Sequence, residues 1–181
     1  MVKPGTRALG VAVSGGDDRA TVAGAVVRAD RVVDGFAITS CTVGGLDSTA
    51  AVTACYERLD REDVRYVLLA GVAPAWFNVV DLRAVHDAVD RPVLAVSFEA
   101  SDGLREPIER EFSGAARDER LAVYESLPDR HPLTVNGERV FVRSVGCESP
   151  DEVVAAFTPE GGRPEPLRVA RLVGRAVDDY V

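Results

Sequence analysis

The chain has 181 residues, a length typical of one domain with a full hydrophobic core. Apolar residues make up 46% of it and aromatic residues only 6%, so the core should consist largely of Val, Ala and Leu. No apolar run approaches the roughly 18 residues that a membrane-spanning helix needs, and the first residues lack the apolar stretch of a signal peptide. We therefore predict a single domain over residues 1–181 with no membrane segment.

The charge pattern is unusual. The 29 acidic residues exceed the 21 basic ones, and Lys3 is the only lysine. This pattern favours a salt-adapted, haloarchaeal cytoplasm; a GC-rich genome would explain the arginine bias but not the acid excess. A net charge of −8 normally argues against nucleic-acid binding. In molar salt, however, the Debye length is only about 3 Å, so this charge does not exclude a nucleic-acid partner.

The first half of the chain reads as strands followed by a helix. The apolar run at 7–14 predicts a central strand, and the Val-rich segments 21–30 and 31–43 predict two more strands of an antiparallel meander. After a Gly-Gly break, residues 47–62 are helical in pattern, with Asp47 or Ser48 as the cap.

Two further strands alternate with helices. Residues 64–71 and 91–98 have the apolar composition of buried strands. Between them, Asn78 is predicted to cap a helix that runs to Val89, with Asp81 in the manner of a capping box. A helix near residues 102–112 follows the second of these strands.

The last third predicts a hairpin and two helices. Asn136-Gly137 is typical of a type I′ turn, so residues 131–146 should form a β-hairpin. Residues 149–157 and 165–181 follow as helices. A meander, then helix-separated strands, then a terminal helix is the order of a ribonuclease H-like α/β fold, with a mixed sheet flanked by helices. Enzymes of that architecture use two metal ions at the strand ends to hydrolyse phosphodiesters.

Several segments resemble the archaeal endonuclease V-like (endonuclease dU) family. The resemblance covers most of the chain, and its pieces occur in the family's order: "RALGVAVS", "VDGFAITSCTVGGLDSTAAV", "VRYVLLAGVAPAWFNVVDL", "RPVLAVS", "VFVRSVG" and "RPEPLRVARLVG". It implies an Mg²⁺- or Mn²⁺-dependent phosphodiester hydrolase of DNA repair that cuts damaged DNA near deoxyuridine.

The metal ligands that this resemblance implies are missing. Apolar residues stand where the first strand should carry an acid, and Gly44 and Ala70 replace two further acids. Arg171 stands where relatives present His or Asp, and Glu99 lies near the place of a phosphate-binding Lys. The candidate pocket therefore carries no assigned catalytic residue, and we predict no metal or other cofactor for it. It comprises Ala12, Val13, Gly44, Asp47, Ala70, Gly71, Trp76, Asn78, Glu99 and Arg171.

Several residues have two interpretations. Asp17, Asp18 and Asp47 could replace the missing ligands, or they could be ordinary turn and cap residues. Trp76 could be a hydrophobic plug or a platform for base stacking. Arg171 could belong to a solvated helix face with its arginine neighbours, or it could face the former metal cavity and make a site that favours phosphate.

Three hypotheses on function follow. The chain could be an endonuclease V-like enzyme, or a non-catalytic module that kept the pocket and binds a nucleotide or nucleic acid. It could also be a structural partner, with a homodimer formed through the edge of the meander. If the site is only disarmed, Gly44→Asp combined with Ala70→Asp should restore metal affinity.

Overall fold

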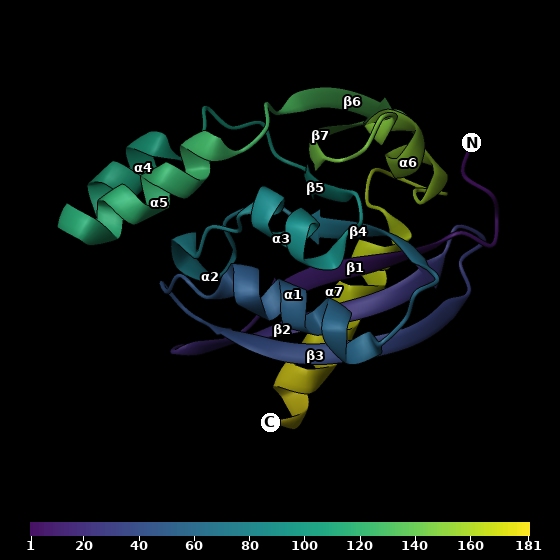
Figure 1. Cartoon of the computed structure of the whole chain (residues 1–181), viewed down its shortest axis with the longest axis horizontal. Helices are drawn as coiled ribbons and strands as arrows, with labels where there is room; N and C mark the ends of the chain where they lie inside the picture. Colours follow the sequence, from purple (N-terminus) through teal and green to yellow (C-terminus); the bar gives the residue numbers. More distant parts are fainter.

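A seven-stranded mixed sheet runs through the protein, with helices on both of its faces (Figure 1). The computed structural model describes all residues from 1 to 181. In the spatial order β3-β2-β1-β4-β5-β7-β6, the strands are β3 (Val33–Thr42), β2 (Arg19–Arg28), β1 (Arg7–Ser14), β4 (Val64–Ala70), β5 (Val93–Ser97), β7 (Glu138–Val145) and β6 (His131–Val135). The helices are α1 (Ser48–Leu59), α2 (Pro74–Phe77), α3 (Leu82–Val89), α4 (Arg105–Glu111), α5 (Gly114–Ser126), α6 (Pro150–Ala156) and α7 (Glu165–Tyr180).

The strand pairing confirms the predicted mixed sheet. β1, β2 and β3 form an antiparallel meander, whereas β4 pairs in parallel with both β1 and β5. The predicted hairpin of β6 and β7 extends the sheet, because β7 pairs antiparallel with β5. β1 and β4 are therefore adjacent parallel strands in the middle of the sheet, and both end at the same edge.

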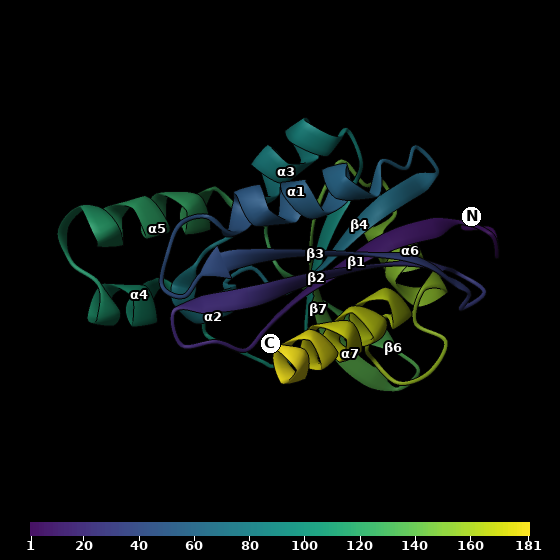
Figure 2. The ribbon, with the colours of Figure 1, turned by 90° about the horizontal axis from the view of Figure 1, so that it is seen from below.

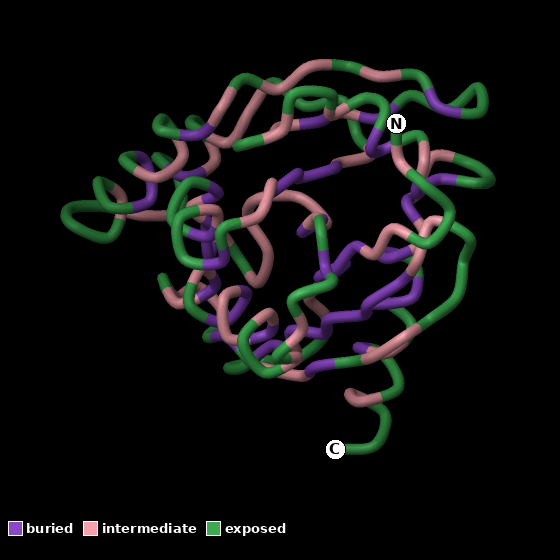
Figure 3. Tube along the Cα trace, turned by 45° about the vertical axis from the view of Figure 1, so that its right-hand side comes forward, coloured by how far each residue is buried: buried purple, intermediate pink, exposed green.

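The two faces of the sheet carry different helices. α1 and α3 lie on one face and α7 crosses the other, as Figure 2 shows. The residues of β1, β2, β4 and β5 are mostly buried between these layers (Figure 3). The pair α4–α5 extends beyond the sheet at the left of Figure 1, and α5 was not predicted from the sequence. The longest helix, α7, has 16 residues, and none of the helices is long and apolar enough to cross a bilayer.

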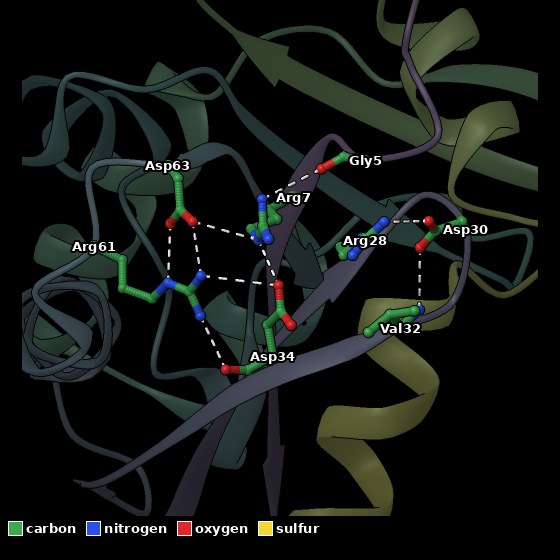
Figure 4. A network of polar contacts seen from close by, with 8 residues as sticks. All are labelled: Gly5, Arg7, Arg28, Asp30, Val32, Asp34, Arg61 and Asp63. Atoms are coloured by element: carbon green, nitrogen blue, oxygen red, sulfur yellow. Dashed lines mark hydrogen bonds and ion pairs between the residues drawn. The ribbon is translucent and has the colours of Figure 1, made fainter.

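Ion pairs join the strands at the edge where β1 and β4 begin (Figure 4). Arg7 contacts the carboxylates of Asp34 and Asp63. Arg61 makes two hydrogen bonds to Asp63, at 2.9 and 2.7 Å, and donates to the backbone oxygen of Asp34. Arginines at this edge are therefore paired with acids.

Gly10 allows α7 to sit directly on β1. A Cβ atom at residue 10 would lie 2.3 Å from the carbonyl carbon of Pro166, which is far inside van der Waals contact. We expect Gly10→Ala to lower the free energy of unfolding by about 1–3 kcal/mol, because backbone must move to make room. Urea denaturation measures this loss. The control is Gly35→Ala, where the nearest atoms to a new Cβ lie 3.7 Å away; equal losses in the two variants would contradict the packing argument.

Candidate functional site

Ala12 and Ala70 lie side by side where β1 and β4 end. The parallel register pairs Val11 with Leu69, which makes Ala12 and Ala70 neighbours. Both side chains face α7, since they pack in one small apolar cluster with Val169 and Ala170 of that helix. The structure thus brings together two of the positions at which the family resemblance implies a metal-binding acid.

A cleft of about 450 Å³ opens between these strand ends and α7. We call it the arginine cleft. It is lined by Ala12, Val13, Ser14, Ala70, Pro74, Ala75, Arg163, Arg171 and Arg175. Four of the predicted pocket residues therefore share one cavity, and its only charged lining groups are guanidinium groups.

The three arginines come from two segments. Arg171 and Arg175 lie one turn apart on α7, and Arg163 lies in the loop before that helix. No carboxylate lies within ion-pair distance of any of them, in contrast to the opposite edge of the sheet. Arg168, on the same helix, is directed away from the cleft and pairs with Glu165 at 2.7 Å. Arg171 lines the cleft and is also exposed to solvent, so its position combines features of both interpretations.

Arg163 is held in a crowded positive environment. Its guanidinium carbon lies 4.0 Å from the centre of the Phe98 ring, so the group is stacked on an aromatic face. Burial lowers the pKa of Arg163, and the charges of Arg171 and Arg175 lower it further. The three side chains therefore repel one another across a space that contains no negative group.

A divalent cation does not fit this cleft. Mg²⁺ and Mn²⁺ bind oxygen ligands, chiefly carboxylates, whereas the lining offers methyl groups, one hydroxyl and three guanidinium groups. Asp17 and Asp18 are exposed in the loop after β1 and do not line the cleft. Nowhere in the chain do three His, Cys, Asp or Glu side chains gather in a metal-binding arrangement.

Asp47 is engaged in a structural network beside the site. Its carboxylate accepts hydrogen bonds from the backbone NH and hydroxyl of Thr42, both at 2.9 Å, and from the amide of Asn78 at 2.8 Å. Burial acts to raise the pKa of Asp47, but these hydrogen bonds outweigh it and the pKa is lowered. Asp47 occupies the N-cap position of α1, as one of the two predicted caps, but its side chain makes no capping hydrogen bond to the helix.

Asn78 is fully buried and lies at the C-terminal cap position of α2, so it does not cap the start of α3 as predicted. Its side-chain oxygen accepts from the NH of Ser48 at 2.9 Å, and its amide also donates to the backbone oxygen of Thr42. Asp81 caps α3 instead, since its carboxylate accepts from the NH groups of Arg83 and Ala84. The helix begins at Leu82 because the preceding residues follow a different backbone path.

That path is a left-handed turn at α2. Ala75, Trp76 and Phe77 have φ angles of 50°, 57° and 57°, a conformation that costs a non-glycine residue about 1–2 kcal/mol. The NH of Gly44 donates to the oxygen of Ala75 at 2.7 Å, and Phe77 packs edge-on against Phe112. Trp76 is 55% exposed, so it does not act as a buried plug. Strain of this kind is often found at functional sites.

A second cavity, of about 280 Å³, lies on the other side of residues 70–75. Gly71 and Glu99 line it, as do Val72, Ala73, Ala95, Ser97, Ser101, Gly103, Leu104, Tyr124, Arg130, Phe141 and Arg143. Ala70, Pro74 and Ala75 face the arginine cleft, whereas the three residues between them face the second cavity. One short segment therefore forms the wall between the two cavities.

Gly44 lines neither cavity. Its carbonyl oxygen and that of Gly45 accept hydrogen bonds from Arg120 of α5, which is 3% exposed and stacks on Phe112. Gly44 therefore does not share the cleft that Ala70 lines, although its NH is bonded to Ala75 of the cleft wall.

Several site residues were not predicted. Ser14, Arg163 and Arg175 line the arginine cleft, and Arg130 and Arg143 line the second cavity. The spacing of Arg171 and Arg175, four residues apart on one helix, is the signal that could have included Arg175. Arg163 gives no such signal, because it lies in an irregular loop.

Comparison with known proteins gives consistent results. Residues 4–178 match the model of a family described as endonuclease dU. A UPF0215 protein of Pyrobaculum calidifontis is 32% identical over 172 residues, which is 91% of this chain and 92% of that protein. A protein of unknown function from Archaeoglobus fulgidus has a similar crystal structure, with a TM-score of 0.83 and 27% identity over 94% of this chain and 97% of the other.

Endonuclease V is a more distant structural relative. The Ciona intestinalis enzyme, solved in complex with a DNA that contains inosine, has a TM-score of 0.61 at 12% identity. The match covers 97% of this chain and 86% of that one. This likeness confirms the predicted ribonuclease H-like fold.

Proposed function

The chain belongs to the endonuclease dU family, and on that premise we propose that it binds damaged DNA at the arginine cleft without metal-dependent cleavage. The observation that carries the proposal is the composition of the cleft. Three guanidinium groups without acidic partners line the cleft, and Arg171 stands at one of the positions where the family resemblance implies a metal ligand. Guanidinium groups bind phosphate oxygens through paired hydrogen bonds, and they repel divalent cations.

The negative net charge is compatible with this proposal. Contacts to phosphate act over a few ångströms, and at molar salt more distant charges are screened within about 3 Å. A local group of unpaired arginines therefore matters more than the total of −8.

The second cavity is a suitable place for a deaminated base. It adjoins the arginine cleft through residues 70–75, and Tyr124 and Phe141 contribute aromatic rings to its lining. Enzymes that act on a single base turn it out of the helix into such a pocket. A backbone phosphate in the cleft would place the neighbouring nucleotide beside this opening.

Metal-dependent hydrolysis is the second candidate, and the family match over residues 4–178 favours it. It would require ligands from outside the cleft, and the exposed Asp17 and Asp18 are the nearest candidates in sequence to the end of β1. The two functions differ in their need for a cation.

Duplexes that contain deoxyuridine or deoxyinosine distinguish the two candidates. We expect fluorescence anisotropy to show binding that is the same with Mn²⁺ and with a chelator, and we expect no nicked product on a denaturing gel. Arg175→Gln should weaken binding about tenfold, the value of one charge-assisted hydrogen-bond pair. Arg168→Gln is the matched control, because it removes the same charge from the same helix outside the cleft. Nicking that depends on Mn²⁺ and is lost in Asp17→Asn or Asp18→Asn would establish the nuclease instead.

A further inference from the structure

We propose that the arginine cleft binds a phosphomonoester, the dianionic phosphate of a nucleotide or of a nucleic-acid strand end, in the place where relatives would hold metal. The inference rests on the proposed function only in taking nucleic acid as one source of that phosphate. It specifies a terminal phosphomonoester rather than an internal phosphodiester, because the phosphodiester carries only a single negative charge.

The charge of the cleft matches a dianion. Arg163, Arg171 and Arg175 contribute three positive charges, and no acidic residue lines the cavity. A phosphomonoester carries a charge of about −1.5 to −2 at pH 7, and its three free oxygens can each accept hydrogen bonds. One phosphodiester would leave two of the three charges without compensation.

The nearby acids are already engaged elsewhere. Glu165 is bound by Arg168 through two hydrogen bonds of 2.7 and 2.8 Å. Asp178 accepts a hydrogen bond of 2.6 Å from the hydroxyl of Thr21. Neither carboxylate lines the cleft, so its three arginines have no acidic partner within the protein.

The alanines make room for the anion. A carboxylate at residue 12 or 70 would repel a phosphate, whereas the methyl groups present there do not. The cavity of about 450 Å³ is within the usual range for small-molecule sites, so it also has space for part of the attached nucleotide. The residues that exclude a metal ion are therefore the ones that admit a phosphate.

Oligonucleotides that differ only in their terminal phosphate test the proposal directly. Single-stranded oligonucleotides of one sequence would carry a 5′-phosphate, a 3′-phosphate or hydroxyls at both ends, with inorganic phosphate and dUMP as competitors, all in chelator. We expect at least one phosphorylated oligonucleotide, or dUMP, to bind at least about tenfold more tightly than its hydroxyl-terminated counterpart. Arg171→Gln and Arg175→Gln should each abolish most of this preference, and Arg168→Gln should retain it. Circular dichroism confirms that each variant is folded.

The outcomes separate this inference from the proposed function. Equal binding of all oligonucleotide ends, with no competition by dUMP, would overturn the phosphomonoester site while leaving DNA binding intact. Binding of dUMP that depends on Arg171, without binding of any oligonucleotide, would support the site and overturn the proposed function. A phosphate preference that survives in Arg171→Gln would place the phosphate elsewhere and overturn the inference.

Discussion

Replacing Asn78 by alanine should lower the free energy of unfolding by about 3 kcal/mol, because the buried NH of Ser48 would lose its partner and two further hydrogen bonds would be lost. Asn78 is fully buried, and its side chain joins three backbone or side-chain groups: the NH of Ser48, the backbone oxygen of Thr42 and the carboxylate of Asp47. Each buried group that loses its partner costs about 1–3 kcal/mol. Guanidinium chloride denaturation, followed by circular dichroism at constant KCl, measures the loss.

A matched control removes one exposed hydrogen bond of the same network. Thr42→Val deletes only the hydroxyl that donates to Asp47 at 2.9 Å, and the backbone NH of residue 42 keeps its own bond to that carboxylate. We expect a loss of about 1 kcal/mol or less in this variant. Equal losses for Asn78→Ala and Thr42→Val would mean that Asn78 does not hold the network together.

The stability of this network matters for the site. Asn78 directly follows the left-handed turn of Ala75, Trp76 and Phe77, and Ala75 lines the arginine cleft. The hydrogen bond from Gly44 to Ala75 ties the same turn to the loop after β3. The network therefore offsets part of the backbone strain that shapes the cleft wall.

The sheet could be predicted because its central strands are apolar runs that lie buried between helices. The apolar run at 7–14 and the two Val-rich segments after it match β1, β2 and β3, and apolar composition identified β4 and β5. The order of the elements then limited the fold to a few topologies. The pairing of the last hairpin with β5 could not be predicted, since a hairpin sequence does not specify its neighbour.

The helices beside the site were harder to predict for two physical reasons. α5 projects from the sheet and buries only Arg120 and Leu121, so it lacks the apolar stripe that identifies a helix packed on a core. The spacing of Asn78 and Asp81 resembles a capping box, but the left-handed turn before them changes the direction of the chain. Ala, Trp and Phe rarely adopt positive φ, so nothing in the sequence indicates that turn.

The site itself was only partly predictable. Ala12, Ala70 and Arg171 were expected from the family resemblance, and the structure brings them together. Arg163 joins them because its loop packs across Phe98, which is a contact between distant parts of the chain. The cleft would need carboxylates in place of the methyl groups of Ala12 and Ala70 to hold a cation.

Restoring those two carboxylates and removing one arginine should create a metal site. We expect Ala12→Asp, Ala70→Asp and Arg171→Gln together to bind Mn²⁺ with a dissociation constant of about 10⁻⁴ M or tighter, the range of simple carboxylate sites. The two new side chains would extend from neighbouring parallel strands toward α7, and removal of Arg171 would reduce the opposing positive charge. Electron paramagnetic resonance of free Mn²⁺ in molar KCl measures the binding, and the unaltered protein should show none.

The comparison variant carries Gly44→Asp with Ala70→Asp and the same Arg171→Gln. It has the same number of new acids, but residue 44 has a φ of 70° and lines neither cavity, so its carboxylate would not converge with that of residue 70. We expect this variant to bind Mn²⁺ at least about tenfold more weakly than the first, because one carboxylate alone is a poor site. Equal Mn²⁺ binding by the two variants would show that the ends of β1 and β4 do not define the site.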